Sequence, residues 1–373
     1  MRQSLAFLSI LPLVLTHPTK HAYQCIDFDV PLSFQAPSLE PAFLPFKSHY
    51  DSVAFLQSLS SRTSSDGPSP YKGQSTIDVN VTIAAQFCFP PGRSPTTVQI
   101  LSHGLGFDHV YWSFGGQNSE YNYVKAATAA GYSTLSYDRL GNGGSTKGDA
   151  YTLNQATIET EVLKRLTDHV RSWDIPCLSH LHAPTKVTHV GHSFGSQITN
   201  QLVSTYPNVS DGIVLTGYST LPASVDFAIG TNFFLAKDVL PQIYGNLSTG
   251  YLIWDQQSQN QYLFLHWPNF SPQVLAEGEQ NKWPLSISEL LSTSVHNATN
   301  FSNPALIISG QYDGVFCGFN CTGVLPQART TFSGATPFET YVQPNTGHGI
   351  NLHYNSTGAY QVINNFLARN VKN

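Results

Sequence analysis

A serine flanked by two glycines follows a run of residues that favour β-structure. The stretch is VTHVGHSFGSQ (187–197), and a helical pattern begins at its end. A serine hydroxyl is a weak nucleophile until a base removes its proton. A tight turn from strand to helix would hold Ser193 at the edge of a sheet, and Gly191 and Gly195 would let neighbouring backbone approach it closely. The bare G-x-S-x-G pattern is common by chance, but this context predicts that Ser193 is a nucleophile.

Three further parts that such chemistry needs occur elsewhere in the chain. A base must take the serine proton, a carboxylate must orient that base, and backbone N–H groups must bind the oxyanion. Asp313 in SGQYDG and His348 in NTGHG each follow a predicted strand, which gives the order Ser–Asp–His. The HGLG stretch (103–106) also follows a strand, so we expect the Leu105 and Phe194 amides to form the oxyanion hole. These positions predict a triad of Ser193, Asp313 and His348.

Aspartates elsewhere compete with Asp313 for the role of the acid. Asp226, Asp238 and Asp255 lie in a segment rich in aromatic residues, and they do not end a predicted core strand. Because Ser193 and His348 each follow a predicted core strand, and Asp313 does so too, we favour Asp313 as the acid.

The nucleophile and its partners need strands that end at one edge of a sheet. Buried strands are predicted over 96–104, 133–145 (with the loop that follows), 186–193, 212–219, 304–314 and 339–349. Helices are predicted over 121–132 and 157–173, where apolar residues recur with helical spacing. Strands that alternate with helices predict an α/β fold with a doubly wound, mostly parallel sheet.

The remaining segments complete the expected domain organisation. A short helix is indicated near residues 53–59, and alternation over 77–83 predicts a half-exposed antiparallel strand. The expected units are a signal peptide (1–22), an irregular N-terminal extension (23–75), an α/β core (76–218 and 304–373) and an inserted, mainly helical lid (219–303).

Several features predict a secreted or secretory-pathway glycoprotein. Residues 5–15 form an apolar stretch after Arg2, too short to span a bilayer and typical of a signal peptide. No other run is apolar and long enough to cross a membrane, so we expect no transmembrane segment in the mature chain. N-glycosylation acceptors occur at Asn80, Asn208, Asn246, Asn269, Asn297, Asn300, Asn320 and Asn355.

Cysteine content and charge limit the cofactors and partners. In an oxidising compartment some of the 5 cysteines should pair, and Cys317 and Cys321 could close one loop or each bridge elsewhere. No C-x-x-C pair is present, and the proposed chemistry needs neither a metal nor an organic cofactor. Charged residues make up 11% of the chain, and its net charge is −5. We therefore expect no basic surface of the kind that binds nucleic acid. The expected partner is a small-molecule substrate, and the oligomeric state stays open.

These motifs resemble those of the α/β-hydrolase superfamily over about residues 76–370. The segments that carry the resemblance are SHGLGF, YDRLGNGGS, VGHSFGS, SGQYDG and NTGHG. With its leader and its DHVYWSF stretch, the chain is further similar to secreted fungal members, some of them from natural-product pathways. The resemblance implies a central eight-stranded, mostly parallel sheet and the triad named above. It also implies structural roles for Asp138 and Arg139, which lie in a D-x-x-G-x-G-x-S loop.

The resemblance therefore implies a serine hydrolase for an ester, lactone or thioester of a fairly apolar small molecule. Acyl transfer, carbon–carbon cleavage or a lyase reaction could use the same triad, and a non-catalytic binding protein could share the fold. Tyr111 and Trp112 are expected to line the substrate pocket or to pack in the core. Aromatic residues of the inserted segment suggest an apolar cover: Phe227, Phe233, Phe234, Trp254 and Trp267.

Overall fold

A computed structural model gives the fold, and it describes residues 23–59, 69–176, 178–179, 181–221 and 233–371. The signal peptide predicted over residues 1–22 lies outside the described residues. The central sheet has eight strands in the order β1-β2-β4-β3-β5-β6-β10-β11. Strand β2 runs antiparallel to both β1 and β4, and the other neighbours pair in parallel. The predicted doubly wound, mostly parallel sheet is confirmed.

The strands of the sheet have the following bounds: β1 (Gln24–Pro41), β2 (Tyr71–Phe89), β3 (Thr97–Ser102), β4 (Ser133–Tyr137), β5 (Lys186–His192), β6 (Ile213–Thr216), β10 (Ala305–Gly310) and β11 (Phe338–Gln343). The helices of the core are α1 (His49–Leu59), α2 (Tyr123–Ala129), α3 (Ala156–Ser172), α4 (Phe194–Thr205), α11 (Gly314–Cys317) and α12 (Ser356–Asn370). The core strands and helices predicted from sequence are all present near their expected positions.

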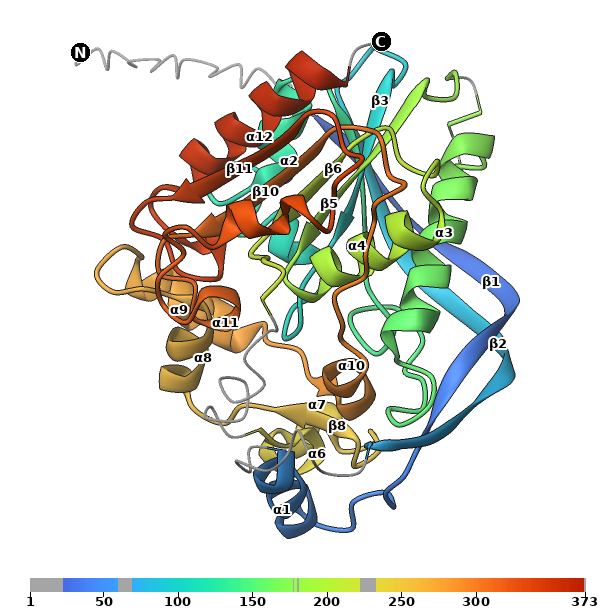
Figure 1. The fold of residues 1–373 in the computed structure, drawn as a ribbon, viewed down its shortest axis with the longest axis vertical. Coiled ribbons are helices and arrows are strands. Elements are labelled where there is room, and N and C mark those ends of the chain that lie inside the picture. Colours follow the sequence, from blue (N-terminus) through green and yellow to red (C-terminus); the bar gives the residue numbers. More distant parts are fainter. Residues whose placement is uncertain (1–22, 60–68, 177, 180, 222–232, 372–373) are drawn as a thin grey trace, which may run out of the picture.

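Helices cover both faces of the sheet (Figure 1). Helices α3 and α4 pack together on one face, and α2 and α12 pack together on the other. Residues of β3, β5, β6 and β10 point alternately into the two layers, and both directions are buried. Burial on both faces explains why these strands are continuous apolar runs in the sequence.

The N-terminal extension is ordered into a strand, which corrects the expectation of an irregular segment over 23–75. Strand β1 pairs with β2 in a long antiparallel hairpin, and Cys25 lies directly opposite Cys88, to which it is disulfide-bonded. Apolar residues recur at every second position from Ile26 to Ala36, and Pro31 and Pro37 fall on the opposite, exposed face of the strand. Since β1 is an edge strand, a proline that lacks a backbone donor is tolerated there.

An insert follows β6, and we define it as residues 233–303 of the described chain. Its elements are β7 (Phe234–Leu235), α6 (Ala236–Val239), α7 (Pro241–Tyr244), β8 (Tyr251–Ile253), α8 (Gln257–Phe264), α9 (Pro272–Gln280), β9 (Leu285–Ser286) and α10 (Ile287–Leu291). The segment is mainly helical, as expected, but β7, β8 and β9 also form a small sheet that the sequence did not indicate. Figure 1 shows the insert below the carboxyl ends of the parallel strands.

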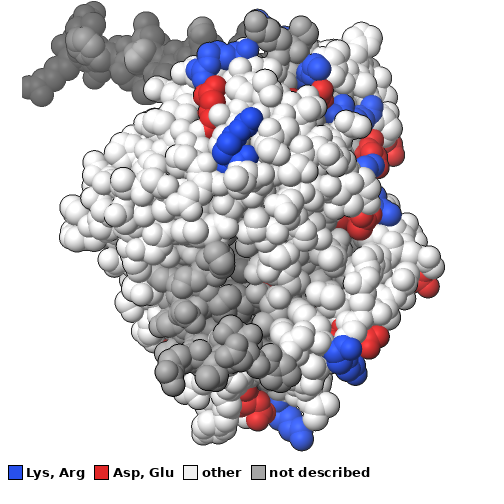
Figure 2. Space-filling view, viewed as in Figure 1, with Lys and Arg blue, Asp and Glu red and all other residues white. Residues whose placement is uncertain are grey.

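Charge is sparse on the surface. On the face shown in Figure 2, acidic and basic side chains are few, lie mostly near the edges and are mixed in sign. None of the described helices is long and apolar enough to cross a membrane. A second disulfide joins Cys317 to Cys321 and closes the short loop after α11, one of the two arrangements left open by the sequence.

Buried histidines should make stability depend on pH. His189 on β5 contacts Thr167 Oγ1 at 2.9 Å and Ser210 Oγ at 2.8 Å, and burial, with a smaller effect of Arg171, lowers its pKa to about 3. The folded state therefore keeps this imidazole neutral, whereas the unfolded chain binds a proton below about pH 6.5. Stability should fall as pH decreases from 6.5 towards 3, by about 2 kcal/mol per such histidine by pH 5.

A His189→Gln variant tests this expectation, because glutamine keeps hydrogen-bonding groups but does not titrate. Urea unfolding at pH 7 and pH 5 should show a smaller loss of stability than in the wild type. The exposed His182→Gln variant is the control and should keep the wild-type slope. Equal slopes for all three proteins would contradict the assignment.

Candidate active site

The turn between β5 and α4 places Ser193 in an unusual backbone conformation. Its φ is 55° and its ψ is −117°, and its N–H donates to Thr216 O at 2.9 Å. The glycines around it are required by close approach. A Cβ at Gly191 would lie 2.5 Å from Gly195 O, and a Cβ at Gly195 would lie 2.1 Å from Ser102 O. The sequence pattern therefore folds into the expected tight strand-to-helix turn.

Hydrogen bonds connect Ser193 to a histidine and then to a carboxylate. His348 Nε2 lies 2.8 Å from Ser193 Oγ, and His348 Nδ1 lies 2.8 Å from Asp313 Oδ2. All three side chains are buried. The three predicted residues are brought together, although 155 and 35 residues of sequence separate the bonded pairs. The arrangement can transfer the serine proton to an imidazole whose cation a carboxylate would stabilise.

The histidine and the carboxylate are each fixed by further contacts. The His348 ring packs against Phe264 and Phe316, with centroid distances of 5.9 and 5.8 Å. Asp313 uses its other oxygen, Oδ1, to accept from the Phe316 N–H at 3.0 Å, which caps the start of α11. Because both carboxylate oxygens are engaged, Asp313 presents one defined oxygen to His348.

The two amides expected to bind an oxyanion belong to segments beside Ser193. Phe194 is the first residue of α4, directly after the serine, and Leu105 lines the same pocket as Ser193. The backbone before Leu105 is very close to Ser193, since a Cβ at Gly104 would lie 2.9 Å from Ser193 Cβ. Their role as oxyanion donors stays a proposal.

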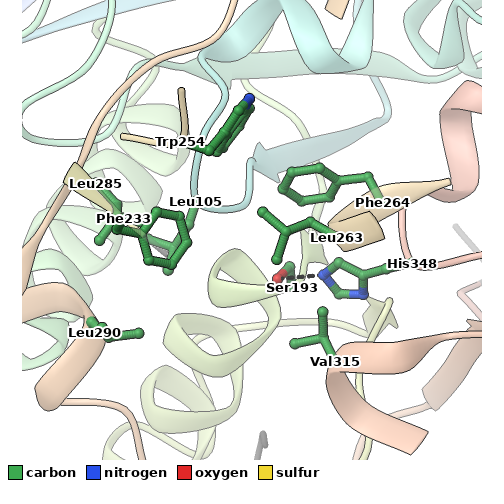
Figure 3. Close-up of a pocket in the computed structure, with 10 residues that line it drawn as sticks. All are labelled: Leu105, Ser193, Phe233, Trp254, Leu263, Phe264, Leu285, Leu290, Val315 and His348. Atoms are coloured by element: carbon green, nitrogen blue, oxygen red, sulfur yellow. Dashed lines mark hydrogen bonds between the residues drawn. The ribbon is translucent and has the colours of Figure 1, made fainter. Parts of the chain in front are cut away.

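An apolar pocket opens over Ser193 and His348 (Figure 3). Apart from these two residues, its walls are Leu105, Phe233, Trp254, Leu263, Phe264, Leu285, Leu290 and Val315. The part lined by described residues encloses about 60 Å³. Most of these wall residues come from the insert. Of the five aromatic residues that the sequence suggested as an apolar cover, Phe233 and Trp254 are among the walls. Phe264 and the aliphatic wall residues could not be told from ordinary core residues in the sequence.

Trp254 is held tightly at one end of this pocket. Its Nε1 donates to Glu279 Oε2 at 2.8 Å, and Lys282 Nζ donates to its carbonyl at 2.8 Å. Its ring lies over Gly106, where a Cβ would come within 2.5 Å of the indole. Gly106 also has a φ of 80°, so a side chain there is disfavoured both by the contact with the Trp254 ring and by the backbone conformation.

Comparison with known proteins identifies the family of this fold and site. A model for the alpha/beta hydrolase family matches residues 99–355. The chain belongs to the alpha/beta hydrolase family. Its fold is similar to that of a thermophilic esterase from Thermogutta terrifontis (15% identity, TM-score 0.53, covering 78% of this chain and 94% of that chain). It is also similar to a monoacylglycerol lipase from Paleococcus ferrophilus (14% identity, TM-score 0.51, covering 78% and 98%). A search of curated proteins found no match.

Six other described residues that the sequence singled out are not among those that line the pocket of this alpha/beta hydrolase. Tyr111 and Trp112 are buried and are not among the residues that line the described pocket, which agrees with the second of the two expected places, packing in the core. Tyr111 stacks on the His192 ring at 4.4 Å. Asp238 pairs with Lys237 on the surface of the insert. Asp255 and Trp267 are exposed and Phe234 is half-buried, whereas Asp226 and Phe227 lie outside the described residues.

One cluster has the composition of a metal site but is fully engaged within the protein. Asp108, His109 and Asp138 place ligand atoms within 4.8 Å of one another. Asp138 accepts from the His109 N–H at 2.9 Å and from the Gly144 N–H at 2.7 Å, and Asp108 accepts from Trp283 Nε1 at 2.9 Å. These bonds fix the loop after β4, and we assign the cluster no metal.

The expected glycosylation acceptors are on or near the surface. Six are exposed: Asn80, Asn208, Asn246, Asn297, Asn300 and Asn320. Asn269 and Asn355 are half-buried, and Asn355 Nδ2 donates to Pro344 O at 3.3 Å. A glycan is therefore more easily accommodated at the six exposed sites.

An Asp313→Asn variant tests the contact between the carboxylate and His348. Asparagine Oδ1 can still accept from the Phe316 N–H, so the melting temperature should stay close to that of the wild type. An amide facing His348 Nδ1 would favour the wrong tautomer and stabilise no imidazolium, so kcat for ester hydrolysis should fall by about 10⁴. The exposed Asp255→Asn variant is the control, and a wild-type kcat for Asp313→Asn would rule out this carboxylate as the acid.

Proposed function

We propose that the protein is a serine hydrolase that cleaves an ester, lactone or thioester of a fairly apolar small molecule through an acyl-enzyme on Ser193. The observation that carries the proposal is the hydrogen-bonded chain Ser193–His348–Asp313 at the floor of an apolar pocket. An apolar cavity with a few convergent polar groups is the usual form of a small-molecule site. Side chains and backbone amides supply each step, and no step is assigned to a cofactor.

Acylation uses the distances in the site. Ser193 Oγ attacks the substrate carbonyl carbon while His348 Nε2, 2.8 Å away, takes the hydroxyl proton. The carbonyl oxygen becomes an oxyanion that the Leu105 and Phe194 amides bind. The imidazolium is stabilised by Asp313 and then gives its proton to the leaving alcohol or thiol, which departs as the acyl-enzyme forms.

Deacylation repeats the cycle with water as the nucleophile. His348 takes a proton from the water, the hydroxide attacks the acyl carbon, and Ser193 leaves with the proton that the imidazolium returns. The products are the free acid and the regenerated serine. If an alcohol replaced the water, the same machinery would transfer the acyl group instead.

The location proposed for this reaction is the secretory pathway or the outside of the cell. Two disulfides support an oxidising compartment. The exposed acceptor asparagines would carry glycans that solubilise a surface with few charges. The resemblance of DHVYWSF to secreted fungal enzymes adds a natural-product ester as a substrate to be tested.

A series of p-nitrophenyl esters of increasing acyl length tests the proposed reaction. The wild type should hydrolyse the shorter members, because the described pocket is apolar and small. Ser193→Ala should lower kcat by at least about 10⁴, since the nucleophile and its base act as one unit. Wild-type labelling by a fluorophosphonate at Ser193 without hydrolysis would favour acyl transfer or a lyase reaction. Neither hydrolysis nor labelling would favour a binding protein.

Trp254 should limit the length of the acyl group. A Trp254→Leu variant keeps an apolar wall but opens the end of the pocket, so kcat/KM for longer esters should rise relative to short ones by about tenfold or more. Trp267→Leu is a matched control, because Trp267 is an exposed tryptophan of the same insert, with 58% of its surface accessible. An unchanged length preference in Trp254→Leu would place the acyl group elsewhere.

A further inference from the structure

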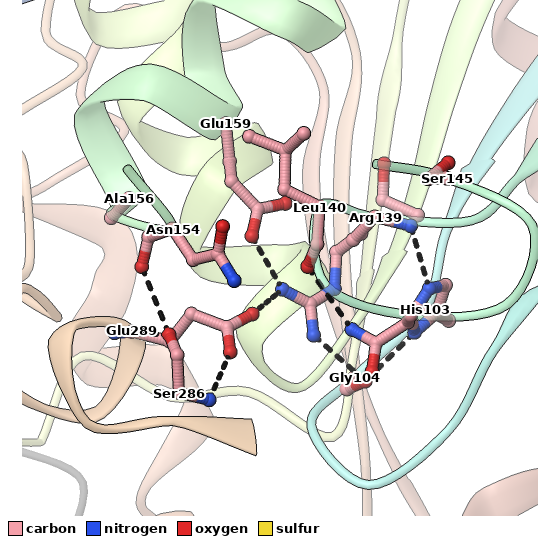
Figure 4. Close-up of polar contacts among 12 residues, drawn as sticks. His103, Gly104, Arg139, Leu140, Ser145, Asn154, Ala156, Glu159, Ser286 and Glu289 are labelled. Atoms are coloured by element: carbon pink, nitrogen blue, oxygen red, sulfur yellow. Dashed lines mark hydrogen bonds and ion pairs between the residues drawn. The ribbon is translucent and has the colours of Figure 1, made fainter. Parts of the chain in front are cut away.

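The carbonyl of Gly104 accepts two side-chain hydrogen bonds next to the proposed oxyanion hole (Figure 4). His103 Nδ1 lies 2.8 Å from Gly104 O, and Arg139 Nη2 donates to the same oxygen at 3.3 Å. This carbonyl and the N–H of Leu105 belong to one planar peptide unit. Whatever holds the oxygen therefore also sets the direction of the Leu105 N–H.

We propose that Arg139 is a positioning residue that orients the 104–105 peptide for oxyanion binding, and that Glu289 of the insert anchors Arg139 in that position. The inference rests on the proposed function, because it assigns the Leu105 N–H a partner that exists only during acyl transfer.

Arg139 also acts on the same carbonyl through its backbone. Its N–H donates to His103 Nε2 at 3.0 Å, so this nitrogen is the acceptor of the ring. The proton of the neutral imidazole is then on Nδ1, which donates to Gly104 O. Burial lowers the pKa of His103 well below its usual range, and the nearby Arg139 charge adds to this effect, so the ring stays neutral. Two donors on one carbonyl also polarise the N–H of the same peptide and strengthen it as a donor.

The second proposed oxyanion donor touches the same side chain. The guanidinium carbon of Arg139 lies 4.6 Å from the centroid of the Phe194 ring, and Phe194 carries the other N–H. A single buried arginine thus contacts both segments that would bind the oxyanion. Its place in the D-x-x-G-x-G-x-S loop indicated only a structural residue.

Two glutamates from different parts of the chain hold the guanidinium. Arg139 Nη1 bonds Glu159 Oε1 of α3 at 2.9 Å and also bonds Glu289 Oε1 of α10. The three side chains are at most 1% exposed. A buried ionic cluster of this kind is costly to desolvate, and apolar side chains of similar volume often stabilise a fold as well or better. Stability alone therefore gives little reason for an arginine here. The planar guanidinium, in contrast, offers separate N–H donors that can bind the two glutamates and the Gly104 carbonyl at the same time.

Glu289 connects this cluster to the walls of the pocket. The capping box of α10 fixes Glu289 through its second oxygen, which accepts from the Ser286 N–H at 2.6 Å. Leu285 and Leu290, on either side of this box, both line the pocket. An acyl group in the pocket would thus contact the same short segment that anchors Arg139.

Arg139→Lys and Glu289→Gln test the inference in the full-length protein. A lysine keeps the positive charge but cannot reach both glutamates and Gly104 O at once. We expect kcat for the best p-nitrophenyl ester to fall about 10- to 100-fold in Arg139→Lys, below the 10²–10³ for loss of a whole donor, with KM within about threefold of the wild type. Glu289→Gln should give the same pattern with a loss of about 3- to 10-fold, because glutamine can still accept from Arg139.

Inhibition by a trifluoromethyl ketone of matched acyl length gives the decisive measurement, because the ketone forms an oxyanion on Ser193. Its inhibition constant should rise by the same factor as kcat falls. Arg165→Lys is the matched control, because Arg165 is an ion-paired arginine of α3 whose guanidinium lies 4.0 Å from the Phe34 ring centroid. Its replacement should change neither kcat nor the inhibition constant. Melting temperatures of all variants separate loss of fold from loss of orientation.

Each outcome decides between the roles. Lower melting temperatures with wild-type kcat and ketone inhibition would make Arg139 a structural residue only and overturn the inference. A raised KM at unchanged kcat would overturn it too. If Arg139→Lys does not fold, Glu289→Gln alone decides by the same criteria. A wild type that neither hydrolyses esters nor reacts with a fluorophosphonate overturns the proposed function first, and this is seen before any variant is made.

Discussion

The backbone conformation of Ser193 is the constraint on which the rest of the site depends. A non-glycine residue with a φ of 55° and a ψ of −117° is costly, and such strain persists only where the surroundings enforce it. The enforcement comes from three directions: the bond from the Ser193 N–H to Thr216 O, the contact of Gly191 with the first turn of α4, and the contact of Gly195 with the end of β3. Without this turn the hydroxyl would not face His348.

The parallel sheet solves the second problem, which is to bring distant residues together. Ser193 follows β5, Asp313 follows β10 and His348 follows β11, and the carboxyl ends of these strands meet at one edge of the sheet. Local contacts then set the details. The Asp313 side chain caps α11, and the Cys317–Cys321 disulfide closes the loop behind it, so Asp313 is held by its own short segment.

Sequence reasoning could place these residues because each carries a local signal. Ser193, Asp313 and His348 stand at strand ends among glycines, and their types leave few other roles. The signals fail where a residue acts through partners far away in the chain. The D-x-x-G-x-G-x-S loop indicated only a structural role for Arg139, and its ionic partner Glu289 lies 150 residues away in an insert without a regular alternation of strands and helices. The edge strand β1 carries a local signal too, since apolar residues alternate from Ile26 to Ala36, and a strand could have been predicted there.

The loop that carries Leu105 is clamped on both sides by the insert. On one side, Glu289 holds Arg139, and Arg139 holds Gly104 O. On the other side, the Trp254 ring covers Gly106, and the Trp283 N–H donates to Gly106 O at 3.0 Å. Trp254 is also a wall of the pocket. The residues that would limit the length of the acyl group therefore pack directly against the peptide that would bind its oxyanion. A change in the insert should therefore seldom alter substrate preference without also altering the rate of the chemical step.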